Sequence, residues 1–178
     1  STITAEPEIL TTDETAVITV QLKDAKGNEL TEPGGIVTLS TQDGEELAVT
    51  YAGNGAYSST FYPETLGPVT ITGTVNGDAI GSRATIKVSV GAASPDTSTI
   101  TADPEAITTD GAATITVQLR DAKGNELVDG GDTVTLTTGD GEQLEVEYAG
   151  GGAYIATFDP KTPGLVTITG TVNGHAID

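Results

Sequence analysis

A tandem repeat places the strongest constraint on what this chain can fold into. The segment that begins at Ser1, STITAEPEILTTDETAVITVQLKDAKGNEL, returns from Ser98 as STITADPEAITTDGAATITVQLRDAKGNEL. The match continues without a gap to Gly81 and Asp178, and about two thirds of the aligned residues are identical. A repeat of nearly 100 residues is the size of an independent domain, and it is too long for a solenoid unit that needs neighbours to bury its core.

The repeat therefore predicts two self-contained domains, residues 1–91 and 98–178. The segment between them, residues 92–97, consists of small and polar residues with one proline. This composition is typical of a linker. Its few residues span too short a distance for the two domains to separate widely, since an extended chain gains only about 3.3 Å per residue.

Within each copy, apolar residues alternate with polar ones, which are often threonine. Alternation with a period of two predicts β-strands that have one buried side and one hydrated side. The clearest run, in the first copy and then in the second, places these residues on one face: Ala16, Ile18, Val20, Leu22; Ala113, Ile115, Val117, Leu119. Asn-Gly and Asp-Gly pairs between the runs supply the positive φ angles of tight hairpins. About seven strands per copy, with turns every 8–12 residues, predict a β-sandwich.

The composition excludes several classes of function. The chain carries 7 Lys and Arg against 26 Asp and Glu, and its net charge of −19 repels nucleic acid and anionic membrane surfaces. No window approaches the roughly 20 apolar residues of a membrane-spanning helix. Cysteine is absent, so disulfides and thiolate sites are excluded. We therefore expect no nucleic-acid partner and no membrane insertion.

Three segments in matched order resemble a known family of repeats. They are ITVQLKDAKGNEL (Ile18–Leu30), GNGAYSSTF (Gly53–Phe61) and GPVTITGTVNGDAI (Gly67–Ile80), and each has a counterpart in the second copy. This order and spacing is similar to the bacterial immunoglobulin-like repeats of the invasin and intimin type. The resemblance covers nearly the whole chain twice. It implies an all-β fold of two tandem immunoglobulin-like sandwich domains arranged end to end, the second without its last strand.

The resemblance also implies a function. Such modules are non-enzymatic and extracellular, on the bacterial cell surface or secreted, and they stand in arrays as the stalk of adhesins, with neighbouring repeats of the same chain as their partners. We therefore expect spacer modules that project a distal binding region. A module that contacts a host protein or glycan remains the alternative, although the chain offers only five Tyr and two Phe for such a surface. No receptor-binding residue carries over, because the matched positions are framework strands and turns.

The second copy ends before its last strand. The first copy continues through Ser82–Val90, whereas the second ends at Asp178, where the equivalent segment would begin. We expect the strand Val166–Val172 to have an unpaired edge and the core beneath it to have an uncovered side. Two explanations stay open: the segment was cut from a longer array, or a strand from an adjacent subunit fills the gap, as in a filament.

No catalytic site is predicted. His175 occupies the tip of a predicted hairpin, and we expect a solvated turn residue. The carboxylate pairs Glu45 with Glu46 and Glu145 with Glu147 have the residue types of a glycosidase pair, but a packed sandwich offers no evident cleft for a sugar. With 26 acidic residues, such pairs arise by chance, and we expect a solvated acidic surface.

A calcium site at the junction of the two domains is a further hypothesis. Loops at the end where the first domain leaves and at the end where the second begins both carry acidic residues, and clustered carboxylates repel unless a hard cation neutralises them. The alternative is a bare joint held by linker packing. The candidate ligands are Asp13, Glu14, Asp43, Glu45, Glu64, Asp96, Asp121, Asn125 and Glu126.

Overall fold

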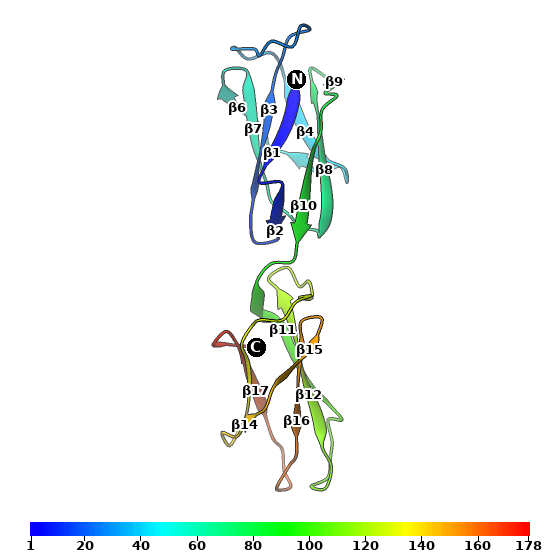
Figure 1. Ribbon diagram of the computed structural model, residues 1–178, viewed down its shortest axis with the longest axis vertical. Coiled ribbons are helices and arrows are strands. Elements are labelled where there is room, and N and C mark those ends of the chain that lie inside the picture. Colours follow the sequence, from blue (N-terminus) through cyan, green and yellow to red (C-terminus); the bar gives the residue numbers. More distant parts are fainter. The chain divides into compact units, whose positions relative to one another are not determined.

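The computed structural model describes residues 1–178 and divides them into two compact units, Ser1–Ser89 (unit 1) and Val90–Asp178 (unit 2). Every regular element is a β-strand (Figure 1). With no helix present, there is none of the length and apolarity needed to cross a membrane. The predicted all-β class and its division into two sandwiches are confirmed.

Unit 1 consists of two facing sheets. The first is antiparallel, in the order β1 (Thr2–Glu6), β3 (Ala16–Gln21), β7 (Ala56–Phe61) and β6 (Thr50–Gly53). The second runs β2 (Ile9–Thr11), β10 (Ala84–Ser89), β8 (Gly67–Val75), β4 (Val37–Thr41) and β5 (Glu46–Leu47), and β9 (Asp78–Ala79) also pairs with β8. In this sheet β10 pairs antiparallel with β8 and parallel with β2. The last strand of unit 1 therefore lies between two earlier ones.

The core of unit 1 lies between these sheets. Strand β3 shows why: Ala16, Ile18 and Val20 are fully buried, whereas Val17 between them is half exposed. This is the alternation expected from the sequence, because successive side chains of a strand point to opposite faces. Strand β10 contributes in the same way from the opposite sheet, with Ile86 fully buried.

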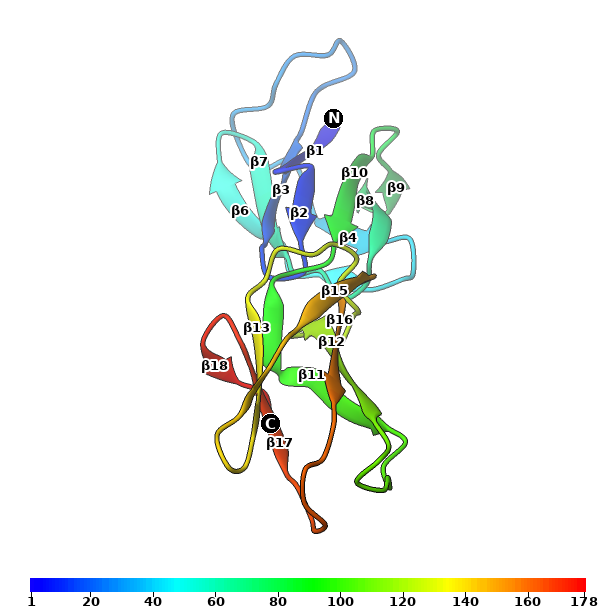
Figure 2. The ribbon, with the colours of Figure 1, turned by 60° about the horizontal axis from the view of Figure 1, so that its bottom comes forward.

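Unit 2 repeats the first sheet but only part of the second. Its first sheet has the order β11 (Ala93–Asp103), β12 (Ala113–Asp121), β16 (Ala153–Phe158) and β15 (Glu147–Gly150). The second has the order β14 (Gln143–Leu144), β13 (Val134–Thr138), β17 (Ile168–Val172) and β18 (His175–Ala176) (Figure 2). Counterparts of β2 and β10 are absent from residues 90–178, so this edge of the sheet is β17, with only the two-residue β18 paired to its end. Residues 90–178 therefore hold no equivalent of β10, since the sequence runs only to the counterpart of Gly81.

The hairpins use the predicted turn chemistry. Asn76 and Gly77, between β8 and β9, have φ angles of 52° and 87°, and Asn173 and Gly174 repeat them at 51° and 84°. Asparagine and glycine tolerate this left-handed region, which other residues avoid. The turn is also tied to the sandwich, because Asn76 accepts a hydrogen bond through Oδ1 from the backbone N–H of Ile36.

The predicted linker differs from what the structure shows. Most of residues 92–97 belongs to β11, where Ala93 pairs with Asp121 and Ser94 with Arg120 before a register shift. Hydroxyl groups hold this irregular edge: Thr97 Oγ1 donates to the carbonyl of Asp121 at 2.8 Å, and Ser98 Oγ donates to that of Ser94 at 2.7 Å. Small hydroxyl residues suit a linker and a bulged edge strand equally, so composition alone did not distinguish the two.

Candidate functional site

The open edge of unit 2 is the principal candidate site. A groove of about 610 Å³ lies where unit 1 has β2 and β10, and it is lined by residues before β12, at the end of β16 and at the start of β17. Apolar side chains form its floor, among them Ile107, Ile115, Phe158, Val166 and Ile168. Its position follows directly from the missing strand.

The same residue types are buried in unit 1 and uncovered in unit 2. Val69 is 5 % exposed and its counterpart Val166 is 39 % exposed. Ile71 is fully buried, whereas Ile168 is only partly buried. The difference does not come from the side chains, which are identical at both positions. It comes from the absence of β10 over them.

The backbone responds as well. Strand β8 spans nine residues, Gly67–Val75, whereas β17 spans five, Ile168–Val172. The segment that is not extended into a strand, residues 164–167, is the counterpart of the part of β8 that pairs with β10. Likewise residues 106–108, which correspond to β2, form no strand. Without β10 between them, these two segments lack the ladder of hydrogen bonds that defines a strand. Single backbone bonds remain, because the carbonyls of Thr167 and Thr108 accept from the N–H groups of Gly139 and Gly111.

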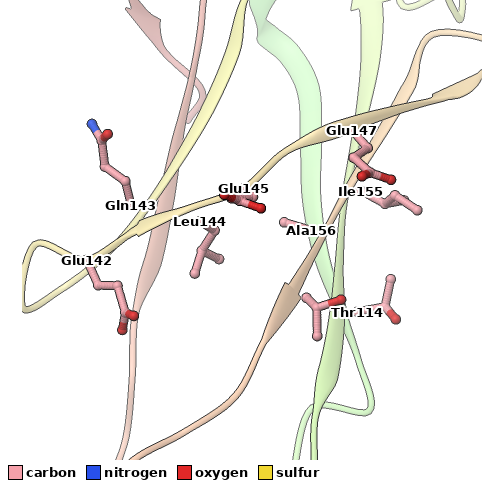
Figure 3. Close-up of a pocket in the computed structure, with 9 residues that line it drawn as sticks. Thr114, Glu142, Gln143, Leu144, Glu145, Glu147, Ile155 and Ala156 are labelled. Atoms are coloured by element: carbon pink, nitrogen blue, oxygen red, sulfur yellow. The ribbon is translucent and has the colours of Figure 1, made fainter.

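A second hollow in unit 2 is acidic. It has a volume of about 440 Å³, and Figure 3 shows Glu145, just after β14, and Glu147, the first residue of β15, near Ala156 and Ile155 of β16. Both glutamates are exposed to solvent, as the sequence analysis expected for this pair.

The third carboxylate of the acidic hollow has a cationic partner. Glu142 Oε1 accepts a hydrogen bond from Lys161 Nζ at 2.6 Å. This hydrogen bond and the charge of Glu142 raise the pKa of Lys161 above its ordinary value. Glu46, which the sequence paired with Glu45, lies in β5 of unit 1 on an exposed position.

The predicted calcium ligands of unit 1 lie in three loops. Asp13 and Glu14 lie between β2 and β3, Asp43 and Glu45 between β4 and β5, and Glu64 between β7 and β8. Glu14 has a local role, because its Oε2 accepts hydrogen bonds from the backbone N–H and the hydroxyl of Thr11, at 2.8 and 3.2 Å.

Two of the predicted ligands of unit 2, Asp121 and Glu126, have nitrogen partners. Asp121 is fully buried, and its carboxylate accepts hydrogen bonds from the backbone N–H groups of Gly91, Lys123 and Asn125 and from the side-chain amide of Asn125, at 2.9–3.2 Å. Glu126 forms an ion pair with Arg120 at 2.7 Å. A carboxylate surrounded by N–H donors offers its lone pairs to them and not to a cation.

The corresponding loop of unit 1 has the hydrogen bonds within the loop, in an exposed position, but no counterpart of the one from Gly91. Asp24 accepts from the N–H groups of Lys26 and Asn28 and from the Asn28 side chain, each at 2.8 Å. The side-chain hydrogen bond from Asn28 is the main reason that the pKa of Asp24 lies below its ordinary value. These loops are therefore Asx-type turns held by their first residue.

No group of three or more His, Cys, Asp or Glu side chains that could hold a metal ion is found in the structure. Asp96 lies in the irregular part of β11, and His175 lies exposed in β18. The interdomain calcium site requires residues of both units, and it stays a prediction. The sequence analysis did not predict that Asp121 is buried. The one feature that distinguishes Asp121 from Asp24 in the sequence is that residues 90–97 precede the second repeat, and these residues contact Asp121 in the structure.

The fold and the open edge define a class: tandem immunoglobulin-like β-sandwich domains, the second with an incomplete sheet. The family model described as "Invasin, domain 3" matches residues 1–91 and again residues 94–178. The chain belongs to this family. The predicted resemblance to invasin and intimin repeats is thereby confirmed. No curated protein matches the chain.

Solved structures show the same fold. The Escherichia coli adhesin FdeC is 22 % identical with a TM-score of 0.64, over 98 % of this chain and 60 % of that one. Invasin, described as a bacterial integrin-binding protein, is 25 % identical with a TM-score of 0.62, over 99 % of this chain and 37 % of that one. InvD of Yersinia pseudotuberculosis is 23 % identical with a TM-score of 0.51, over 99 % of this chain and 54 % of that one. The chain therefore spans less than two thirds of each of these structures.

Proposed function

We propose that this chain forms two spacer domains of a bacterial cell-surface adhesin, where they extend a distal binding region away from the cell. The observation that carries the proposal is that one family domain occurs twice in succession with its framework retained. Solved relatives of the same fold are adhesins by name. The proposal places the chain outside the cell and assigns it no catalytic step.

The strand arrangement of unit 1 supports a role under tension. The chain enters unit 1 at β1 and leaves after β10, and these two points lie at opposite ends of the unit (Figure 1). Strands β2 and β10 are parallel, so a pull on the two ends draws them in opposite directions along their axes. Their hydrogen bonds are then loaded together and not one after another.

These hydrogen bonds are short and join backbone groups. The N–H of Lys87 donates to the carbonyl of Glu8 at 2.8 Å, and the N–H of Thr12 donates to the carbonyl of Ser89 at 3.0 Å. Surface charge fits the same role, because a net charge of −19 keeps neighbouring copies apart in solution.

Small-angle X-ray scattering of the whole chain tests the spacer proposal. Strands of 8–10 residues give a domain roughly 35–40 Å long at about 3.3 Å per residue, so we expect two domains in line to reach roughly 70–80 Å. A compact profile, with the two domains side by side, would contradict a spacer.

A binding assay on host cells and on a glycan array tests the rival role as a binding module. We expect no signal from the two domains alone, because an extended region beyond them would make the contact. Saturable binding by this chain would instead assign the recognition function to it.

A further inference from the structure

We propose that Asn54, in the turn between β6 and β7 of unit 1, is a site of spontaneous covalent modification. Its side-chain amide would be lost as ammonia and replaced, with water as the co-reactant, by the carboxylate of aspartate or isoaspartate. The inference rests on a comparison of three turns that share one dipeptide. It is independent of the spacer proposal, since the chemistry needs only the folded chain and water.

The reactive dipeptide is asparagine followed by glycine, and the chain holds three: Asn54-Gly55, Asn76-Gly77 and Asn173-Gly174. The backbone nitrogen of the glycine attacks the side-chain carbon Cγ of the asparagine, unhindered by a side chain of its own. The new N–Cγ bond closes a five-membered imide, the Cγ–Nδ2 bond breaks, and Nδ2 leaves as ammonia with the proton of the glycine nitrogen. Water then opens the imide at one of its two carbonyls. The attack requires an asparagine side chain that is free to turn toward the next residue.

The side chain of Asn76 is held in place. Its Oδ1 accepts a hydrogen bond from the backbone N–H of Ile36 at 2.9 Å, and its own backbone N–H donates to the carbonyl of Ile36 at 2.8 Å. The side-chain amide also lies directly against Gly35, where the space would not admit a Cβ atom. Turning toward Gly77 would break the side-chain hydrogen bond and this packing.

Asn173 is held in the same way in unit 2. Its Oδ1 accepts a hydrogen bond from the backbone N–H of Thr133 at 3.0 Å, and its Nδ2 donates to the carboxylate of Asp132 at 2.8 Å. Both polar atoms of this amide are therefore bound, and both hydrogen bonds must break before Cγ can meet the nitrogen of Gly174. A typical hydrogen bond slows a step that must break it by roughly fivefold.

Asn54 lacks such restraints. Its side-chain amide forms no hydrogen bond in the structure, and the residue is exposed. Its backbone carbonyl accepts a hydrogen bond from Gln21 Nε2 at 3.1 Å. Rotation of the side chain toward Gly55 therefore breaks no hydrogen bond.

The backbone around Asn54 opens at low cost. Asn54 has a φ of 50°, and the glycines on its two sides, Gly53 and Gly55, have φ angles of 97° and 66°. Strand β6 is a four-residue edge strand, and its register with β7 shifts between Tyr51 and Gly53. Short, irregular edges are the parts of a sheet that open at the lowest free energy. The Gly55 nitrogen can thus approach Cγ while the rest of the sheet stays paired.

One hydrogen bond restrains the attacking atom. The N–H of Gly55 donates to the hydroxyl of Tyr51 at 3.2 Å. This bond is long, its acceptor is neutral and Tyr51 is 42 % exposed, so water can replace the hydroxyl. Tyr51 therefore slows the reaction and does not prevent it.

The accessibility of this turn does not depend on where the chain begins. Gly151 holds the place of Asn54 in unit 2, and it is exposed although residues 90–97 precede that repeat. Its φ of 59° shows that the turn forms without asparagine. Unit 2 therefore keeps the turn and lacks the site, which makes Asn54→Gly a substitution that the fold accepts.

The products would alter unit 1 alone. Either one adds a negative charge at position 54, and isoaspartate also lengthens the backbone by one carbon atom. Gly55 is buried against the carbonyl of Leu30, where no Cβ atom would fit, and its own carbonyl accepts a hydrogen bond from the N–H of Leu22 at 3.1 Å. A longer backbone cannot keep both contacts, so isoaspartate should loosen this end of the β6–β7 hairpin.

Incubation of the whole folded chain at neutral and at alkaline pH, followed by tandem mass spectrometry, tests the proposal. We expect aspartate and isoaspartate to appear at position 54 several times faster than at Asn76 or Asn173. The reaction should be faster at alkaline pH, because the attacking nitrogen must lose its proton. In urea, where the contacts are absent, the three rates should converge, since each asparagine precedes a glycine. Convergence would assign the folded-state ranking to structure and not to the dipeptide.

Two variants sharpen the test. Asn54→Gly should remove the fast reaction and leave the two slow ones unchanged. Tyr51→Phe removes the hydroxyl and keeps the ring, and it should speed the reaction at Asn54 by about fivefold, since one hydrogen bond no longer opposes the attack. The rate at Asn173 is the internal control, because it should be the same in both variants and in the original chain.

Equal rates at the three asparagines of the folded chain would overturn the inference, and so would a faster reaction at Asn76 or Asn173. An unchanged or slower reaction in Tyr51→Phe would contradict attack by the Gly55 nitrogen.

Discussion

Units 1 and 2 have largely the same sequence and different cores. Unit 1 buries 17 hydrophobic residues in one cluster, whereas unit 2 buries nine and leaves several counterparts half covered. Ile3, Phe61 and Ile71 belong to the buried set of unit 1, and their equivalents in unit 2 are only packed against its margin. A single strand of six residues, β10, accounts for the difference at Ile71 and Val69, because it pairs with β8 directly over them. Burial in a sandwich is therefore a property of the complete sheet.

Unit 2 has one feature that unit 1 lacks. Val90 and Ala93, which precede its repeat, pack against the core of unit 2, and the N–H of Gly91 donates to the buried carboxylate of Asp121. The equivalent Asp24 of unit 1 is exposed. The end of unit 2 that holds Asp121 is thus more buried than the equivalent end of unit 1. The edge of unit 2 beside β17 is less buried than the equivalent edge of unit 1.

The largest expected effect is a difference in stability between the units. Full burial of one aliphatic or aromatic side chain contributes about 1.5–3 kcal/mol, and several such side chains are half covered in unit 2. We expect two calorimetric transitions separated by more than about 10 °C, since about 1 kcal/mol shifts the melting temperature of a domain this size by 4–8 °C. Hydrogen exchange should assign the lower transition to unit 2.

Restoring the strand sharpens this comparison. A variant that carries SRATIKVSV directly after Asp178, which occupies the place of Gly81, should raise the lower transition toward the upper one. The same extension with Asp in place of its single Ile, the equivalent of Ile86, should leave the lower transition unchanged. Unchanged melting with both extensions would show that β10 is not what separates the two units.

Next in size is a pair of equivalent substitutions. Ile71→Ala should destabilise unit 1 by about 2–5 kcal/mol, the range for a fully buried aliphatic side chain. Ile168→Ala should cost unit 2 about half as much or less, because its side chain is partly exposed. Urea unfolding followed by hydrogen exchange measures both, and equal losses would contradict the assigned burial.

The aspartate turns give the opposite ranking. Asp121→Asn should destabilise unit 2 by about 1–3 kcal/mol, because the new NH₂ group would face N–H donors in a buried site. Asp24→Asn in unit 1 should have a smaller effect, because water can reach the exposed turn. Thermal melting of the two variants against the original chain decides this ranking.

A smaller effect is expected on acidification. The pKa of Asp24 is lowered in the folded state by hydrogen bonds from Asn28, and that of Asp140 chiefly by the Thr138 hydroxyl. A lowered folded pKa means that the unfolded state binds the proton more readily, so this stability is complete above the ordinary value of 3.8 and is lost as pH falls below it. Urea midpoints between pH 6 and pH 3 should fall less in Asp24→Asn than in the original chain.

The smallest expected effect concerns calcium. If the predicted interdomain site binds, calcium should raise the melting temperature by a small amount over that in EDTA, and Asp43→Asn with Glu45→Gln should remove the increase. Magnesium is the control, because its smaller coordination sphere suits clustered carboxylates less well. Identical melting in calcium and EDTA would contradict the site.

The strand alternation, the hairpin turns and the doubled domain were all predictable from sequence, because they depend on local periodicity and on residues such as Asn76 that adopt unusual φ angles. The open edge was predictable as well, because it follows from comparing two copies of one pattern. The burial of Asp121 beneath the residues before the second repeat was not predictable from sequence, because the composition of those residues suggested a linker.

The sequence by itself determined that residues 1–178 hold two β-sandwiches of one family, with the second copy of the pattern running as far as the counterpart of Gly81. Only the tertiary structure decided which side chains of unit 2 lie uncovered where unit 1 has β10, and how they join residues 105–109 and 164–168 into one groove. The reason is that periodicity specifies the direction in which a side chain points, whereas burial depends on which strand lies next to it, and neighbours in a sheet are distant in the chain.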